Sequence, residues 1–242
     1  LTLTYRVVFN TSKDYPFSAT LYSHEGEAQY AITGSNGFMN VYLRPTFNSE
    51  DIAGPYMITH QKEFNLLVDN PYRGVAYNSL SASILINNIT SADIASVELR
   101  NPANAEEWLE VTPVQDGSGL RLNLGPMTGM SVQPGGALTL KLRIKFNTAA
   151  VYPVAVSLFS HDQTEAIQIG SFTSAMTVYH PPSLDTSQFE GPYFNGKAKD
   201  VTLTVHNPEN GMPLNVMSAN LLIQNMAASD IVIKVYIEGM GI

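Results

Sequence analysis

The sequence predicts an all-β fold made of antiparallel β-sandwiches. Three observations predict it: apolar and polar residues alternate with a period of two, segments recur at a fixed offset along the chain, and the composition is poor in charge. The chain has 242 residues, of which 44% are hydrophobic and 14% charged. Typical soluble domains are roughly 25% charged. Ser, Thr, Asn, Gln and Gly therefore supply most of the expected polar surface.

The predicted strands are segments that alternate apolar with polar residues or are rich in β-branched residues. They are residues 1–9, 17–23, 63–69, 79–86, 120–124, 138–146 and 200–206. Clusters of Gly, Pro, Asn and Asp lie between them and predict turns. Only residues 102–108 have the composition of a helical turn. This density of short strands is typical of two antiparallel sheets packed face to face.

The sequence also matches itself without a gap at an offset of 137 residues, and we call two residues so related counterparts. Phe9-Asn10-Thr11 matches Phe146-Asn147-Thr148, and 12 of the first 24 positions are identical to their counterparts. The matches continue in register as far as Asp93-Ile94 and Asp230-Ile231. We interpret this as a tandem duplication whose period is the length of one domain.

Two stretches resemble a known family. Residues 178–219 read as a strand, a Gly-containing turn and a strand ending in Asn-Pro, and residues 133–162 as a Pro-Gly turn followed by two long strands. This pattern resembles the ASH/PapD-like immunoglobulin superfamily, which includes Hydin-type ciliary proteins, luminal PapD-like domains of secretory-pathway membrane proteins, and bacterial surface repeats. The resemblance implies tandem immunoglobulin-like sandwiches.

The resemblance also suggests domain boundaries. Residues 38–174 are expected to form one complete sandwich, 1–37 the closing strands of a preceding repeat, and 175–242 the opening strands of the next. A division at residue 137 would instead cut just before a long strand. Partial domains expose strand edges that must be covered. The two partial repeats could pair with each other, or with neighbouring chains by strand addition.

Charge and cysteine content exclude several function classes. The net charge is −8 and Lys and Arg form no run, which argues against binding nucleic acid or anionic lipid. Without cysteine the chain has no disulfide, thiol nucleophile or zinc–thiolate site. No segment is apolar for long enough to insert into a membrane. Because the first residue is Leu1, we expect the sequence to be part of a longer protein.

The clearest catalytic candidates are His24 and His161, each of which follows a serine and precedes an acid. Neighbouring residues of a strand point to opposite faces, so this adjacency cannot assemble a Ser-His-acid triad. Glu106 and Glu107 are adjacent to Trp108, but a glycosidase needs two carboxylates from separate elements. We interpret Trp108 as a core residue and the glutamates as part of a solvated turn. No catalytic, cofactor or metal site is predicted.

Six residues stand out as candidates for other roles. Asn10 and Asn88 begin Asn-X-Ser/Thr triplets and are candidate N-glycosylation sites. The candidates for partner contact are His24, His161, Tyr56 and Tyr193, of which the two tyrosines are counterparts.

The sequence therefore favours a non-enzymatic structural or interaction protein, an extracellular or cell-surface scaffold or filament segment. It would bind protein partners or assemble with itself through sheet edges and loops. One alternative is a carbohydrate-binding β-sandwich, which aromatic side chains would allow. Another is a scaffold of the cilium or of the secretory-pathway lumen, which the resemblance implies. No cofactor, nucleic acid or direct membrane insertion is expected.

Overall fold

The computed structural model describes residues 2–25, 28–215, 217–218 and 220–224. It is all-β, as predicted, with strands and two single-turn 3-10 helices, η1 (Ser91–Asp93) and η2 (Ser187–Phe189). The chain divides into two compact units, Leu1–Met212 and Pro213–Ile242. The strands of the described residues all belong to the first unit. Within the described residues no helix is long and apolar enough to cross a membrane.

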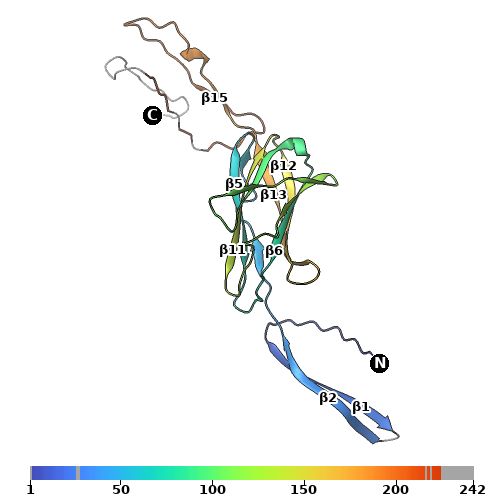
Figure 1. Ribbon diagram of the computed structural model, residues 1–242. Helices are drawn as coiled ribbons and strands as arrows, with labels where there is room; N and C mark the ends of the chain where they lie inside the picture. Colours follow the sequence, from blue (N-terminus) through green and yellow to red (C-terminus); the bar gives the residue numbers. More distant parts are fainter. Residues whose placement is uncertain (1, 26–27, 216, 219, 225–242) are drawn as a thin grey trace. The chain divides into compact units, whose positions relative to one another are not determined.

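Two sheets pack face to face in a β-sandwich, with β5 and β11 in one layer and β6, β12 and β13 in the other (Figure 1). The six-stranded sheet has the order β4 (Tyr56–Met57), β13 (Ile167–Tyr179), β12 (Val151–Ser160), β6 (Leu80–Asn87), β10 (Gly119–Leu124), β9 (Val114–Asp116). The five-stranded sheet has the order β3 (Thr46–Asn48), β5 (Gln61–Asp69), β11 (Ala137–Phe146), β7 (Ile94–Arg100), β8 (Trp108–Glu110). The pairings are antiparallel except that β13 and β4 run parallel.

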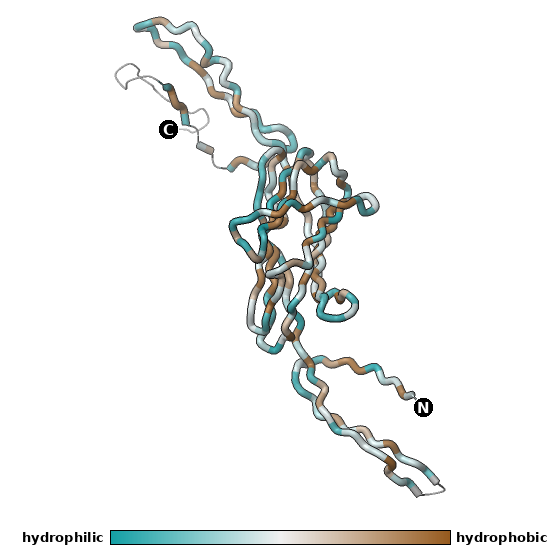
Figure 2. Tube along the Cα trace, in the orientation of Figure 1, coloured by the Kyte–Doolittle hydropathy of each residue, from teal (hydrophilic) through white to brown (hydrophobic). Residues whose placement is uncertain are grey.

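Alternation along the strands builds the core. In β11 every second residue from Leu140 to Phe146 is fully buried, whereas the residues between them are partly exposed. β11 pairs with β5 on one side and β7 on the other, so its inner face lies at the centre of the sheet. Hydrophobic residues accordingly alternate with polar ones along the strands in Figure 2.

An aromatic cluster fills one end of the core. The ring centroid of Phe146 lies 5.4 Å from that of Tyr56, edge to face, and 5.6 Å from that of Tyr152, in a stacked arrangement. The buried hydroxyls find backbone acceptors: Tyr56 donates to the carbonyl of Ile52 (3.1 Å) and Tyr152 to that of Thr148 (3.1 Å). The buried apolar area of the rings and the hydrogen bonds of the two tyrosine hydroxyls together stabilise this end of the core.

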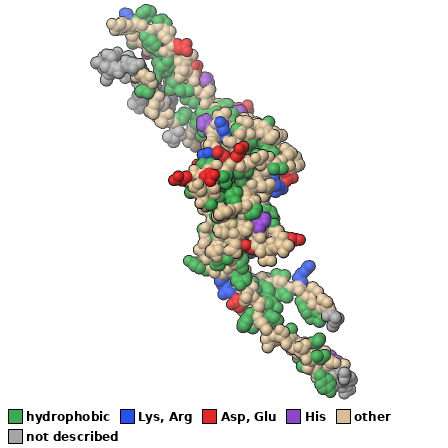
Figure 3. Space-filling view, viewed as in Figure 1, with side chains coloured by type: hydrophobic (Ala, Val, Ile, Leu, Met, Phe, Trp, Pro, Cys, Tyr) green, Lys and Arg blue, Asp and Glu red, His purple; other side chains and the backbone are tan. Residues whose placement is uncertain are grey.

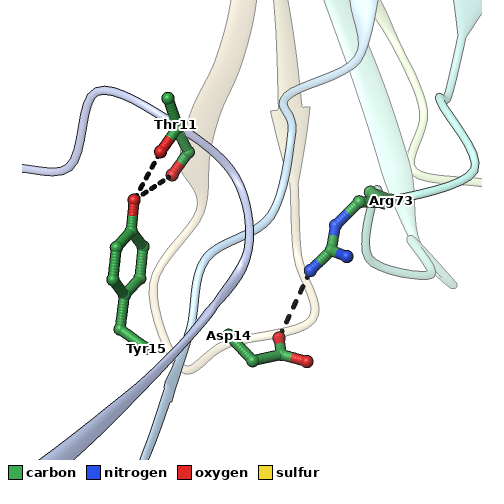
Figure 4. Close-up of polar contacts among 4 residues, drawn as sticks. All are labelled: Thr11, Asp14, Tyr15 and Arg73. Atoms are coloured by element: carbon green, nitrogen blue, oxygen red, sulfur yellow. Dashed lines mark hydrogen bonds and ion pairs between the residues drawn. The ribbon is translucent and has the colours of Figure 1, made fainter.

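Two further hairpins lie outside the sandwich. β1 (Asp14–Glu25) pairs with β2 (Ala28–Asn40), and β14 (Ser183–Asp185) with β15 (Thr204–His206). At the base of the first hairpin the Tyr15 hydroxyl contacts both oxygens of Thr11, and Asp14 forms an exposed ion pair with Arg73 of the β5–β6 loop at 3.3 Å (Figure 4).

The chain enters and leaves the sandwich at opposite ends of β5. On entry, the amide of Leu43 donates to the carbonyl of Arg73, beyond the last residue of β5. On exit, Tyr179 pairs with Met57, before the first residue of β5. β5 has 9 residues. At about 3.3 Å per residue, the two links are roughly 30 Å apart along the strand direction.

Some sequence predictions differ from the structure. Residues 2–9 form no strand, although residues 138–146, their counterparts, lie in β11. A strand needs hydrogen-bonded neighbours, and β11 has one on each side. Residues 102–107 form turns rather than a helical turn. The predicted boundaries after residues 37 and 174 fall inside β2 and β13; the division into repeats stays a prediction.

Candidate functional site

The β1–β2 hairpin has the same strand register as the β12–β13 hairpin of the sandwich. Tyr15 pairs with Met39, and their counterparts Tyr152 and Met176 pair in the same way. Each hairpin contains one register shift, and these two irregularities also occur at counterpart positions: Leu21/Tyr22 and Leu158/Phe159. The local sequence therefore specifies the same hairpin, bulge included, inside the sandwich and outside it.

The two hairpins differ in what covers them. In β12 the inward residues Tyr152, Val154, Val156 and Leu158 are at most 2% exposed. Their counterparts in β1 lie on a surface, with Phe17 37% and Leu21 47% exposed. Figure 3 shows hydrophobic side chains on the visible face of this hairpin. We call the β1 residues Tyr15, Phe17, Ala19 and Leu21 the open face.

The edge of β1 differs in the same way. β12 lies between β13 and β6 and is hydrogen-bonded to both, in register from Val154–Ile86 to Ser160–Leu80. Within the part of the chain that the structure describes, β1 is bonded to β2 alone. Its other edge therefore presents unpaired backbone N–H and C=O groups beside the open face, which is the geometry that accepts an added strand.

The β14–β15 hairpin repeats the register of β3 and β5. Phe47 pairs with Val68, and their counterparts Leu184 and Val205 also pair. β5 continues for 9 residues because β11 accompanies it along its whole length, whereas β15 has 3 residues. Val205 is consequently 43% exposed, against 0% for Val68. Both outer hairpins thus hold apolar residues that the sandwich buries at the counterpart positions.

His161 is held inside a local polar network. Its Nε2 lies 2.8 Å from the Oγ of Ser81, which is 8% exposed. The carboxylate of Asp162 does not orient this imidazole; it accepts bonds from the amide of Asn78 (3.1 Å) and the hydroxyl of Ser160 (3.1 Å). A serine and a histidine meet here from β6 and the end of β12, but among the residues that the structure describes no acid is hydrogen-bonded to this histidine as a triad requires. The sequence analysis did not identify Ser81 as a partner of His161, because the two residues are 80 positions apart.

His24, the counterpart of His161, is exposed at the end of β1. The counterpart of Ser81, the residue that contacts His161, is Ser218. Nowhere in the described part of the chain do three or more His, Asp or Glu side chains converge as a metal site would require.

The two candidate tyrosines have different environments. Tyr56 is 1% exposed and part of the aromatic cluster, so it presents no surface for a partner; the tyrosine serves packing, and burial raises its pKa. Tyr193 is 55% exposed, its hydroxyl donates to the carbonyl of Phe189 (2.7 Å), and the ammonium of Lys199 lies 4.6 Å from its ring. It remains available for contact.

The candidate glycosylation residues are both exposed. Asn10 lies in the irregular segment before β1. Asn88 follows β6 with φ of 57°, a left-handed conformation that asparagine tolerates better than most residues. Neither side chain is enclosed by the sandwich, so an attached glycan would not disturb packing.

Trp108 is not a core residue, contrary to the prediction. It is half-buried in β8, and the guanidinium of Arg143 lies 4.1 Å from its ring centroid. Arg143 also forms a bidentate ion pair with Glu98 at 2.7 and 2.9 Å, which holds the Glu98 pKa below its ordinary value. This cluster ties β7, β8 and β11 together on the outer face of the sheet.

The pKa of Asp93 is lowered, first by the hydroxyl of Thr148 and then by the Thr90 amide (2.9 Å) and hydroxyl (2.8 Å). A depressed pKa stabilises the folded state above the unfolded pKa near 3.9, and this contribution disappears as pH falls through the folded pKa. Asp93→Asn should therefore be less stable than the natural chain at neutral pH, with the difference shrinking below about pH 4. Urea midpoints at both pH values measure this; an unchanged difference would contradict it. Its counterpart Asp230 lies outside the described residues.

One groove lies at the end of the sandwich where the chain enters. It is lined by Leu43, Arg44, Thr46, Asp69, Asn70, Pro71, Tyr72, Gly135 and Gly136. Tyr72 is 90% exposed beside Gly135, and the Oδ1 atom of Asn70 is buried without a hydrogen-bond partner in the described residues. An exposed aromatic ring beside amide and carboxylate groups could contact a polar ligand.

Comparison with known proteins gives no family. No family model matches the sequence, and no curated protein matches it. Among solved structures, similarity is found to AvmM, described as catalysing macrocyclization in alchivemycin A biosynthesis (13% identity, 63% of this chain and 92% of that one, TM-score 0.43). Similarity is also found to a cohesin module of a Clostridium perfringens family 33 glycoside hydrolase (8% identity, 57% of this chain and 98% of that one, TM-score 0.40). A third similar structure is the C-terminal domain of the Streptococcus pyogenes antigen I/II-family protein AspA (8% identity, 68% of this chain and 55% of that one, TM-score 0.32).

Proposed function

We propose that this chain is a segment of a non-enzymatic interaction protein made of tandem immunoglobulin-like sandwiches that bind protein through their sheet edges. The observation that supports this most directly is the open face of β1, whose residues match buried residues of β12 and lie beside an unpaired strand edge. Burying an exposed leucine or phenylalanine is worth about 1.5–3 kcal/mol. A partner that covers the open face would gain both this apolar burial and the hydrogen bonds of a new strand.

The sequence repeat supports the same proposal. The β1–β2 hairpin and the β12–β13 hairpin share the same strand register and the same bulge. In both, a tyrosine hydroxyl donates to the backbone carbonyl four residues earlier. Independent hairpins have no reason to share these details, whereas repeated domains do. The setting proposed from composition is extracellular or at the cell surface, with exposed Asn10 and Asn88 available for glycans; a scaffold of the cilium or the secretory lumen is the alternative.

Sedimentation velocity over a wide range of concentrations tests the proposal. We expect the average mass of the full chain to rise with concentration, and the rise to be lost when Ala19 and Leu21 are both changed to lysine. Ser18→Lys with Thr20→Lys, on the opposite face of β1, is the matched control and should still associate. A chain that stays monomeric throughout, or that associates equally in both variants, would contradict contact through this edge.

A carbohydrate-binding module is the second candidate, favoured by the exposed ring of Tyr72 beside Asp69 and Asn70 in the groove. A glycan array tests it: binding should be present for the natural chain and lost for Tyr72→Ala, because sugars stack on exposed aromatic rings. Tyr193→Ala is the control outside the groove. An array without binding would dispose of this candidate.

A further inference from the structure

We propose that the open face of β1 binds the opening strands of a second copy of this chain, with residues 217–224 adding as a strand to the free edge of β1. This rests on the proposed function and names its partner. The sandwich itself shows the arrangement, since β12 carries β6 along the equivalent edge. Residues 217–224 are the counterparts of β6 (Leu80–Asn87), and the sequences LSASILIN and MSANLLIQ keep its pattern.

The donor strand, like the open face, carries apolar side chains that are exposed. Met217, Leu221, Leu222 and Ile223 are 62%, 55%, 80% and 41% exposed in this structure. At the counterpart positions in β6, Leu80, Ile84 and Ile86 are fully buried against the opposite sheet, and Leu85 is partly buried. Acceptor and donor therefore both expose what the sandwich buries. Strand addition joins them into one sheet, as β6 and β12 are joined, and the inner face of that sheet is left for an opposite sheet to cover.

The register follows from the sandwich. β12 and β6 pair Val154 with Ile86 and Ser157 with Ser83. If the counterparts pair in the same register, Phe17 pairs with Ile223 and Thr20 pairs with Asn220. The same shift brings His24 to Ser218, which restores the contact that His161 makes with Ser81 at 2.8 Å. The duplicated Ser-His pair then joins an acceptor hairpin to its donor strand and performs no reaction.

The first nine residues add to the same interface. The inward residues of β11, Leu140, Leu142 and Ile144, are fully buried between β5 and β7. Their counterparts Leu3, Tyr5 and Val7 are 62%, 81% and 55% exposed. In the sandwich β11 pairs along β5, whose counterpart is residues 198–206. We expect the donor chain to supply this strand also, so that residues 1–9 become a strand only in the assembly.

A second copy is the occupant because of where the links leave the sandwich. The link from β2 contacts Arg73 beyond the end of β5, and the link after β13 leaves beside Met57 before its start. The two links therefore depart from opposite ends of a strand about 30 Å long. Head-to-tail pairing between copies follows this direction, because each sandwich then sends its hairpin one way and its following link the other.

The test is disulfide cross-linking, for which the cysteine-free chain is a clean background. The 242-residue chain is prepared separately with Thr20→Cys and with Asn220→Cys, and the two are mixed and oxidised. Because a disulfide needs Cα atoms within about 7 Å, the mixture should give about tenfold more covalent heterodimer than a mixture of Thr20→Cys with Gln224→Cys, four residues out of register. The doubly substituted chain Thr20→Cys/Asn220→Cys should form a ladder of covalent oligomers.

The outcomes separate this inference from the proposed function. Matched and mismatched mixtures that cross-link equally would overturn the register. A double variant that closes only on itself as a covalent monomer would keep the register but overturn the second copy as the partner. If sedimentation still shows association through the edge of β1, the proposed function survives and only the named partner fails. Adding Leu21→Asp to the Thr20→Cys chain should abolish matched cross-linking. Adding Ser18→Asp to the same chain should leave matched cross-linking intact. Unchanged thermal unfolding of the sandwich shows that neither variant acts by misfolding.

Discussion

Replacing Phe146 with alanine is expected to lower the free energy of unfolding of the sandwich by about 3–5 kcal/mol. Phe146 is fully buried, packs between Tyr56 and Tyr152, and ends the central strand of its sheet. Its removal leaves a cavity among rings that are tied to backbone carbonyls, so the surroundings cannot collapse to fill it. Urea unfolding followed by tyrosine fluorescence measures the change.

Phe9→Ala is the matched control, because Phe9 is the counterpart of Phe146 and lies outside the sandwich core. Its ring centroid is 4.8 Å from that of Tyr15, the same neighbour that Phe146 has in Tyr152. We expect its effect on sandwich unfolding to stay within about 0.5 kcal/mol. If Phe9→Ala and Phe146→Ala lowered the free energy of unfolding equally, Phe146 would not be distinguished from Phe9 as the core residue, and the prediction would be wrong.

The second large effect is expected for Gly74→Ala, with a loss of roughly 2–4 kcal/mol from overpacking and a broken buried hydrogen bond. A Cβ atom at Gly74 would lie 1.9 Å from the Oδ1 of Asn70, a side chain that is 3% exposed and donates to the carbonyl of Val75 at 2.8 Å. Either the asparagine leaves its acceptor or the turn after β5 opens.

Two comparisons identify the cause. Asn70→Ala/Gly74→Ala should cost less than the sum of its single changes, because the alanine at 70 removes the obstructing amide. Gly211→Ala repeats the geometry, with Asn207 Oδ1 also 1.9 Å from the added atom. Asn207 is exposed and can turn into solvent, so that change should have little effect on urea unfolding. A purely additive double variant would show that the clash is not the mechanism.

Strand existence could be predicted from the sequence because it depends on local alternation. The strands expected at 63–69, 79–86 and 138–146 are present within a residue or two. The strand expected at residues 1–9 is absent from the described residues 2–9, although their apolar pattern resembles that of β11. Pattern specifies which face a strand would bury, but hydrogen-bonded neighbours decide whether the strand forms.

The candidate site depended on pairings that sequence adjacency does not reveal. Ser81 meets His161 across 80 positions because β6 and β12 are neighbours in the sheet, and the sequence alone gives no order of strands. Trp108, expected in the core, instead packs against the guanidinium of Arg143 on the outer face of the sheet. The repeat within the sequence is the informative signal, since it relates exposed residues of the outer hairpins to buried residues of the sandwich.

The links at opposite ends of β5 also determine how the sandwich would bear tension. A pull applied through the residues before β3 and after β13 acts parallel to the strands, so neighbouring strands must slide past one another before they separate. Sliding loads many ladder hydrogen bonds at once, whereas peeling would break them singly. In a chain of such domains under load, the rate of forced unfolding would be set by this shear direction, and the sandwich would act as a stiff link.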